Sequence, residues 1–288
     1  MTRFNSIMLG DNPFFGVDHL SHERGRLRSL KNNSFENAVN VVRYSYENGV
    51  KDMMINTHPS IDEFFMELQN ADLLDKINFH PMIPYAAGYV QKITEKGSIG
   101  VLKDILSSTG IKNEIKIISK SGLGFLKKDL GGLFKVFLDV ELLRLKKINV
   151  KVVYLHPAIT DLALSLNLKN IFEIFFDYLQ KNHNVQVGLC TKNFPRLIDK
   201  FDEWDLECPY IMTSFNKSGF LMNPSRQECE TYLEKYSGKL VAMNILAGGF
   251  LDLDTSIEYI KSLKNIDSVI VGVSSIKHAQ ETFSSLKS

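Results

Sequence analysis

Short apolar runs alternate with amphipathic stretches along most of the chain. Eight runs rich in Val, Ile and aromatic residues follow residue 50, at spacings of roughly 25 to 37 residues. They are Lys51 to Thr57, Ile77 to Tyr85, Glu114 to Lys120, Lys151 to His156, Val185 to Cys190, Tyr210 to Phe215, Lys239 to Ile245 and Ser268 to Val273. Apolar residues return at helical spacing between them. Because a βαβ unit takes about 30 residues, the pattern predicts a parallel sheet with a helix after each strand.

Eight such units use up the chain of 288 residues, which indicates a single (β/α)8 TIM barrel over residues 1–288. Residues 1–50 are expected to form a leader and the first helix, and residues 51–288 the eight β-α units. An open doubly wound sheet is disfavoured, because no Gly-x-Gly-x-x-Gly turn follows the first strand. The leader adds a ninth candidate strand at Ile7 to Gly16. It either plugs one end of the barrel, or it is strand one and the Ile77 run is an insertion. We favour the plug.

The amino-acid composition excludes several classes of function. Lys and Arg number 34 against 33 Asp and Glu, so the chain lacks the positive field needed to bind nucleic acid or an anionic membrane. No run approaches a membrane span or a secretory signal, and we expect a cytoplasmic protein with a small-molecule substrate. The three cysteines are scattered, which predicts neither a disulfide framework nor a cysteine zinc site. The oligomeric state is not predicted.

Polar residues follow several of the predicted strands, where the active site of such a barrel lies. His156 ends one strand before Pro157 and is the strongest catalytic candidate, because imidazole donates and shuttles protons near neutral pH. Lys120 ends another, and burial there would depress its pKa for proton relay or nucleophilic attack. A snorkelling lysine and a histidine bonded to a loop are the structural alternatives.

A second group of residues fits a phosphate. Gly248 and Gly249 follow the seventh strand, while Ser274 and Ser275 lead into a helix that also carries Lys277. Glycines let a phosphate approach the backbone, and a helix N-terminus offers free N–H groups. Ordinary turn and capping chemistry is the alternative. Histidines also precede prolines on neighbouring strands, but no H-x-H or H-x-x-x-H pair occurs, so we expect no metal.

Several segments in the second part of the chain resemble motifs of the aldo-keto reductase superfamily. They are Asn113 to Lys120, Val153 to Pro157, Val187 to Phe194 (like "IGVSNF"), Val241 to Leu251 (like "AYSPLAxGxL") and Val269 to Ser275 (like "IIGASS"). The match runs in the family's order over residues 113 to 288. It implies a TIM barrel with NADP(H) bound across the C-terminal loops, with Lys120 and His156 as the catalytic lysine and histidine. The cofactor residues we assign are Asn193, Asn216, Asn244, Gly248, Gly249, Ser274, Ser275 and Lys277.

The first part departs from the family. Gly49 to Thr57 is similar to its "GxxxFDTA" strand, but Asn56 stands where the family has aspartate, and the family's tyrosine does not follow. We therefore assign Asn56 and His58 to substrate orientation and Tyr85 as a substitute phenol. The expected activity is NADP(H)-dependent oxidoreduction of a small polar carbonyl or alcohol, for instance one derived from a sugar. The alternative is a nicotinamide-independent lyase, isomerase or epimerase that acts on a phosphorylated or acidic small molecule.

Overall fold

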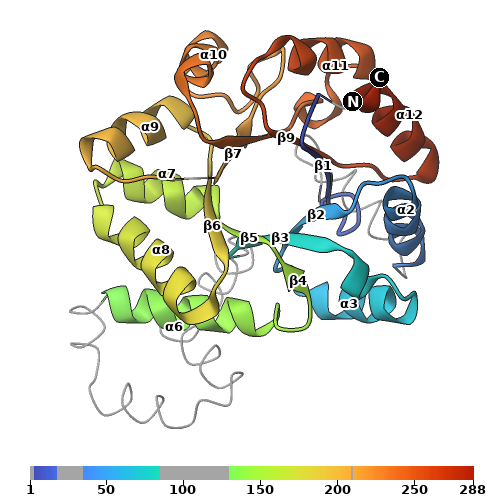
Figure 1. Ribbon diagram of the computed structural model, residues 1–288, viewed down its shortest axis with the longest axis horizontal. Helices are drawn as coiled ribbons and strands as arrows, with labels where there is room; N and C mark the ends of the chain where they lie inside the picture. Colours follow the sequence, from blue (N-terminus) through green and yellow to red (C-terminus); the bar gives the residue numbers. More distant parts are fainter. Residues whose placement is uncertain (1–2, 18–34, 85–129, 209) are drawn as a thin grey trace.

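Eight parallel strands form a closed barrel in the computed structural model, which describes residues 3–17, 35–84, 130–208 and 210–288 (Figure 1). In order around the ring they are β1 (Ser6–Gly10), β2 (Asp52–Asn56), β3 (Asn78–Ile83), β5 (Val152–Leu155), β6 (Gln186–Thr191), β7 (Tyr210–Ser214), β8 (Lys239–Met243) and β9 (Ser268–Val271). A two-residue strand, β4 (Asn149–Val150), lies beside the start of β3. The pairing of β9 with β1 closes the ring. The predicted (β/α)8 barrel is therefore confirmed.

Helices surround the barrel, and each described strand connection carries at least one of them. They are α2 (Glu36–Glu47), α3 (Ile61–Asn70), α6 (Leu130–Leu143), α7 (Pro157–Ser165), α8 (Lys169–His183), α9 (Phe194–Glu203), α10 (Arg226–Lys235), α11 (Leu253–Ser262) and α12 (Ile276–Lys287), with single 3-10 turns η1 (Leu74–Lys76) and η2 (Ala247–Gly249). Local sequence sets several starts. Ser225 and Ser275 accept hydrogen bonds from backbone N–H groups in the first turns of α10 and α12. None of the described helices is long and apolar enough to cross a membrane.

The N-terminal segment is the first strand of the barrel, and the plug that we favoured from the sequence is wrong. Residues Met8 to Gly10 of β1 pair with β2, while Ser6 to Leu9 pair with β9. The physical reason is that a plug would leave hydrogen-bonding edges of β2 and β9 unpaired in the protein interior. The Ile77 run is the third strand of the ring, not an insertion. The Glu114 to Lys120 run lies outside the described residues.

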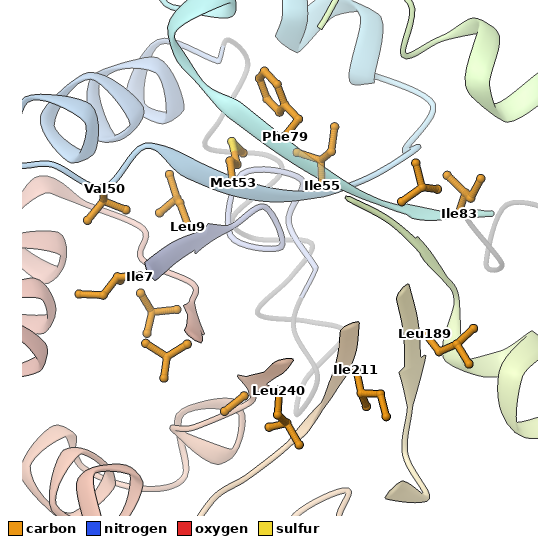
Figure 2. Packing of buried hydrophobic residues seen from close by; sticks show 14 of the residues in the cluster. Ile7, Leu9, Val50, Met53, Ile55, Phe79, Ile83, Leu189, Ile211 and Leu240 are labelled. Atoms are coloured by element: carbon orange, nitrogen blue, oxygen red, sulfur yellow. The ribbon is translucent and has the colours of Figure 1, made fainter. Parts of the chain in front are cut away.

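The strands alternate between two hydrophobic layers. Residues such as Ile7, Leu9, Met53 and Phe79 lie on the side of the strands that faces the helices (Figure 2). The intervening residues fill the barrel interior: Met8, Met54, Met82, Val152, Tyr154, Cys190, Met212, Val241 and Ile270. Because side chains alternate along a strand, this interior set fixes which later residues reach the barrel mouth.

The largest interior side chain, Tyr154, requires a glycine opposite it. A Cβ placed at Gly188 would lie 2.6 Å from Cε1 of Tyr154 and 2.8 Å from the carbonyl oxygen of Tyr210. Burial raises the pKa of the Tyr154 phenol well above its usual value, and its hydroxyl has no partner among the described residues. Tyr154 is thus a packed side chain below the mouth.

Candidate active site

A cavity of about 520 Å³ opens at the C-terminal ends of the strands. This volume lies within the range of about 300 to 1,000 Å³ that small-molecule sites occupy. The described residues that line it are Gly10, Asn12, Pro13, Val17, Met54, Asn56, Met82, His156, Pro157, Cys190, Lys192, Leu221, Met243, Asn244, Ile245, Leu246, Gly248, Gly249, Ile270, Val271, Gly272, Ser274 and His278. Its floor is the interior layer of the barrel, with methionines from three strands. Its polar groups come from the strand ends, as expected for this architecture.

Asn56 lines the cavity and is held by a carboxyl group from the neighbouring strand end. Asp11, just after β1, accepts hydrogen bonds from the Asn56 backbone N–H at 2.6 Å and from Asn56 Nδ2 at 3.0 Å. Since Nδ2 is turned toward Asp11, the Oδ1 atom of Asn56 is the one left for a ligand. Burial raises the pKa of Asp11 from 3.8 to about 7, although the bonds from Asn56 lower it. Asp11 was not among the residues predicted from the sequence, although it follows the Gly10 strand end directly.

His156 combines two roles at the end of β5. Its Nδ1 accepts a hydrogen bond of 3.1 Å from the Ala158 N–H, which caps helix α7. The neutral ring therefore carries its proton on Nε2, which leaves one N–H donor for a ligand. Burial, with a contribution from Lys192, lowers the pKa of His156 from 6.5 to about 4. At neutral pH His156 is thus a neutral hydrogen-bond donor in the cavity wall.

Lys192 brings a positive charge to the cavity wall. In the ring, β6 and β3 lie on opposite sides of β5, the strand that His156 follows. Lys192 follows β6, and its backbone is fixed on both sides. Its N–H donates to Asp161 Oδ2 at 3.1 Å, and its carbonyl oxygen accepts from Nδ2 of Asn223 at 3.0 Å. Asp161 lies on α7, the helix that His156 caps, and it also accepts a 2.5 Å bond from Thr191. One short helix therefore sets the relative positions of His156 and Lys192.

The end of the cavity at β8 and β9 has the donors of an anion site. Gly248 and Gly249 adopt positive φ values of 71° and 93°, and a Cβ at Gly249 would meet no atom within 4 Å. Helix α12 points its N-terminus toward this end, where Ser274 and His278 line the wall. Ser274 Oγ and His278 Nδ1 are 3.2 Å apart. Open glycine backbone and the N–H groups of a helix N-terminus are groups that bind phosphate in proteins.

The cofactor residues predicted from sequence divide into two groups. Four of them line the cavity: Asn244, Gly248, Gly249 and Ser274. Four others do not, and these are Asn193, Asn216, Ser275 and Lys277. Asn216 is buried and holds its own loop by accepting from the N–H of Phe220 at 2.8 Å. Ser275 caps α12, Lys277 lies 3.9 Å from Glu281 on the exposed face of that helix, and Asn193 Oδ1 is buried without a partner among the described residues.

The predicted catalytic set is likewise only partly assembled in the described residues. Asn56 and His156 line the cavity, whereas His58 stacks on Phe15 with ring centroids 4.7 Å apart and is not a lining residue. Burial lowers the pKa of His58, and Arg144 adds to the effect. The other two predicted catalytic residues, Lys120 and Tyr85, lie outside the described residues.

A buried cluster supports the end of β2. The Thr57 hydroxyl donates to the carboxyl group of Glu141 on α6, and Arg144 donates to the Thr57 carbonyl oxygen at 3.2 Å. Helix α6 therefore fixes the loop that follows Asn56. Among the residues that the structure describes, no three His, Cys, Asp or Glu side chains are grouped so as to hold a metal ion.

Several solved structures that match this fold are aldo-keto reductases. One, assigned as an aldo-keto reductase from Pseudomonas aeruginosa, matches with a TM-score of 0.58 at 12% identity, over 98% of this chain and 88% of that chain. The holo form of an aldo-keto reductase from Bacillus halodurans matches with a TM-score of 0.58 at 11% identity, over 98% and 87%. A thermostable aldo-keto reductase in complex with epalrestat matches at 0.52 and 11%, over 97% and 88%.

These matches show that the chain has an aldo-keto-reductase-like barrel, as its motifs predicted. They are similarities of fold, at low sequence identity. No protein-family model matches the sequence, and no curated protein sequence matches it.

Proposed function

We propose that the protein is an oxidoreductase that interconverts a small carbonyl compound and its alcohol, with NADP(H) as cofactor. One observation carries the proposal. A single cavity joins the donor and acceptor at Asn56 and His156 to the glycine turn and the α12 N-terminus. The first pair suits a reacting carbonyl group and its neighbour, and the second set suits the phosphates of a dinucleotide. The aldo-keto-reductase-like fold supports the same assignment.

His156 holds the carbonyl oxygen in this proposal. Its Nε2–H donates to the oxygen and stabilises the negative charge that develops there, which costs no reorganisation because the Ala158 N–H fixes the other ring nitrogen. Asn56 Oδ1 accepts a hydrogen bond from a hydroxyl group next to the carbonyl in substrates that carry one. A reduced nicotinamide, when bound, supplies the hydride. No tyrosine is among the described lining residues, so Tyr85 stays our proposed phenol from the sequence.

The raised pKa of Asp11 favours a second candidate function, that of a nicotinamide-independent isomerase, lyase or epimerase. A carboxyl group with a pKa of about 7 can exchange a proton at neutral pH, and Asp11 lies behind the cavity wall, one hydrogen bond from the Asn56 side chain that lines it. Such an enzyme would exchange a substrate C–H with solvent without any nicotinamide.

Equilibrium titration with NADPH tests the first proposal directly. Wild type and the variant His156→Asn are expected to bind the cofactor equally, while the variant loses about 100-fold or more in the reduction of small aldehydes. The variant Lys264→Gln is the control, because Lys264 is exposed in the loop that leads into β9, at the opposite end of the barrel. Absence of NADPH binding at millimolar cofactor would refute the proposal. Deuterium uptake by substrate without nicotinamide would favour the isomerase.

A further inference from the structure

The cavity wall carries the positive charge of Lys192, and no carboxylate is among its described lining residues. Its described lining residues include Lys192 and two histidines, but no Asp or Glu. Asp161 and Asp11 lie behind the wall and are engaged with Thr191, the Lys192 backbone and Asn56. The Lys192 ammonium makes no ion pair within 4 Å in the described part of the chain, and the Asp161 carboxylate interacts with it only at longer range. The reacting end of the cavity thus offers a cation with no carboxylate in direct contact.

The position of that cation relative to His156 is set by strand register. Leu155 on β5 is level with Leu189 on β6, so His156 is level with Cys190 and two residues behind Lys192. With strands about 4.8 Å apart and about 3.3 Å per residue, the two Cα atoms lie about 8 Å apart. Lys192 has the same inward parity as Cys190, which lines the cavity. A lysine side chain can therefore reach a group a few atoms away from an oxygen held by His156.

We propose that the substrate is an anionic carbonyl compound, whose carboxylate binds Lys192 while its carbonyl oxygen accepts from His156. The assignment of the carbonyl rests on the function proposed above, but the assignment of the carboxylate does not. Lys192 is then the residue that determines specificity for a carboxylate.

Two observations separate this carboxylate from a phosphate of the cofactor. The phosphate-binding set lies at β8 and β9, whereas Lys192 follows β6, beside His156. The floor between them is apolar and is built from side chains such as Met54, Met82 and Ile270. Methionines adapt to apolar groups of varied shape. A ligand that matches both Lys192 and this floor has a carboxylate at one end and an apolar body. Aromatic or branched aldehyde acids and oxo acids have this structure.

The first experiment compares an anionic substrate with its neutral ester, which is larger by one methyl group. NADPH-dependent reduction of 4-carboxybenzaldehyde is measured against that of its methyl ester. Wild type is expected to prefer the anion by about 10-fold or more in kcat/KM, as for a hydrogen bond to a charged group. Lys192→Gln abolishes the preference by raising KM for the anion, Lys192→Arg retains it, and the control Lys264→Gln leaves it unchanged.

The second experiment needs no cofactor and no turnover. Stabilisation against thermal unfolding is measured with 4-(hydroxymethyl)benzoate and with its methyl ester. The benzoate is expected to raise Tm of wild type and of Lys192→Arg, and to lose this effect in Lys192→Gln. Loss of the Lys192 charge also raises the pKa of His156, which a ring-proton titration by NMR detects in a variant that remains folded.

The outcomes distinguish the two proposals. Equal treatment of anion and ester by wild type in both experiments overturns the anionic substrate while the oxidoreductase proposal stands. A raised KM for NADPH in Lys192→Gln with unchanged substrate preference also overturns it, because Lys192 then serves the cofactor. Absence of NADPH binding, together with Lys192-dependent binding of the benzoate, refutes the oxidoreductase and supports the carboxylate site.

Discussion

Replacement of Asp11 by asparagine removes one ionisable group from the buried mouth of the barrel. Asp11 is 1% exposed and accepts hydrogen bonds from both the backbone and the side chain of Asn56. In Asp11→Asn the new Oδ1 still accepts from the Asn56 backbone N–H, but its NH₂ group faces that of Asn56. The Asn56 amide must then rotate, at a free-energy cost that does not depend on pH. The titration of Asp11 is lost completely.

The magnitude follows from the pKa of Asp11. In the unfolded chain the carboxyl group ionises near 3.8, and in the folded protein burial raises its pKa to about 7. Between these values the folded protein binds the extra proton, so the contribution of Asp11 to stability is present below 3.8 and is lost as pH rises through 7. At 1.36 kcal/mol per pKa unit, wild type loses about 3 kcal/mol of unfolding free energy between about pH 4.5 and about pH 8 through this group.

Urea unfolding followed by far-ultraviolet circular dichroism measures the effect. The unfolding free energy of Asp11→Asn minus that of wild type is expected to rise by about 3 kcal/mol from about pH 4.5 to about pH 8. The difference cancels every group that both proteins share, including His156. The control is Asp205→Asn, an exposed loop position at φ 52° that both residue types adopt. A difference that stays flat with pH would refute the reasoning that Asp11 is protonated at neutral pH.

Two further changes test the rest of the site and its floor. His156→Asn keeps a cap for α7 but removes a histidine whose pKa falls to about 4 in the folded protein. Wild type should therefore lose about 2 kcal/mol more unfolding free energy than the variant on acidification from about pH 7 to about pH 4.5. Urea unfolding of both proteins at both pH values measures this, and an unchanged difference in unfolding free energy would contradict it. Gly188→Ala should cost about 3 kcal/mol in urea unfolding, because the new Cβ overlaps the Tyr154 ring. The double variant with Tyr154→Leu should recover part of that loss, and a fully additive result would exclude the overlap as its cause.

The sequence pattern predicts the barrel well because strand periodicity and spacing are local properties. Seven of the eight predicted runs fall on described strands, from Lys51 to Thr57 onward, and the eighth predicted run lies outside the described residues. The remaining place in the ring belongs to Ser6–Gly10, for which we had predicted a plug. Which of nine similar runs closes a ring depends on pairing between the two ends of the chain. Periodicity along one segment contains no information about that pairing.

Prediction of the site was weaker, because alternation along a strand must be combined across strands. Positions two residues beyond interior side chains reach the mouth, and this rule applied to Met54, Tyr154 and Cys190 gives Asn56, His156 and Lys192. The first two were assigned to the site from the sequence, and the third was given no role. Asparagines and serines at strand ends were assigned to cofactor by type, but Asn216 and Ser275 turned out to bond their own loop and helix. Local capping competes for the same residue types that bind ligands.

The pair of Asp11 and Asn56 shows how a motif can be absent from a strand while its chemical group is present in the site. The motif resemblance expects a carboxylate at position 56 of β2, and the chain has an amide there. The structure supplies a carboxyl group from the end of β1, bonded to that same amide through both its backbone and its side chain. Adjacent parallel strands lie about 4.8 Å apart, so an acidic residue on either strand end reaches the same place. Placing the carboxyl group on β1 and not on β2 also changes the chemistry of the site. Asp11 is fully buried and its pKa is raised to about 7, whereas the side chain of Asn56 lines the cavity. The described part of the site therefore presents the Asn56 amide, the neutral His156 ring and the Lys192 cation at neutral pH, and the substrate that we propose matches the Lys192 charge.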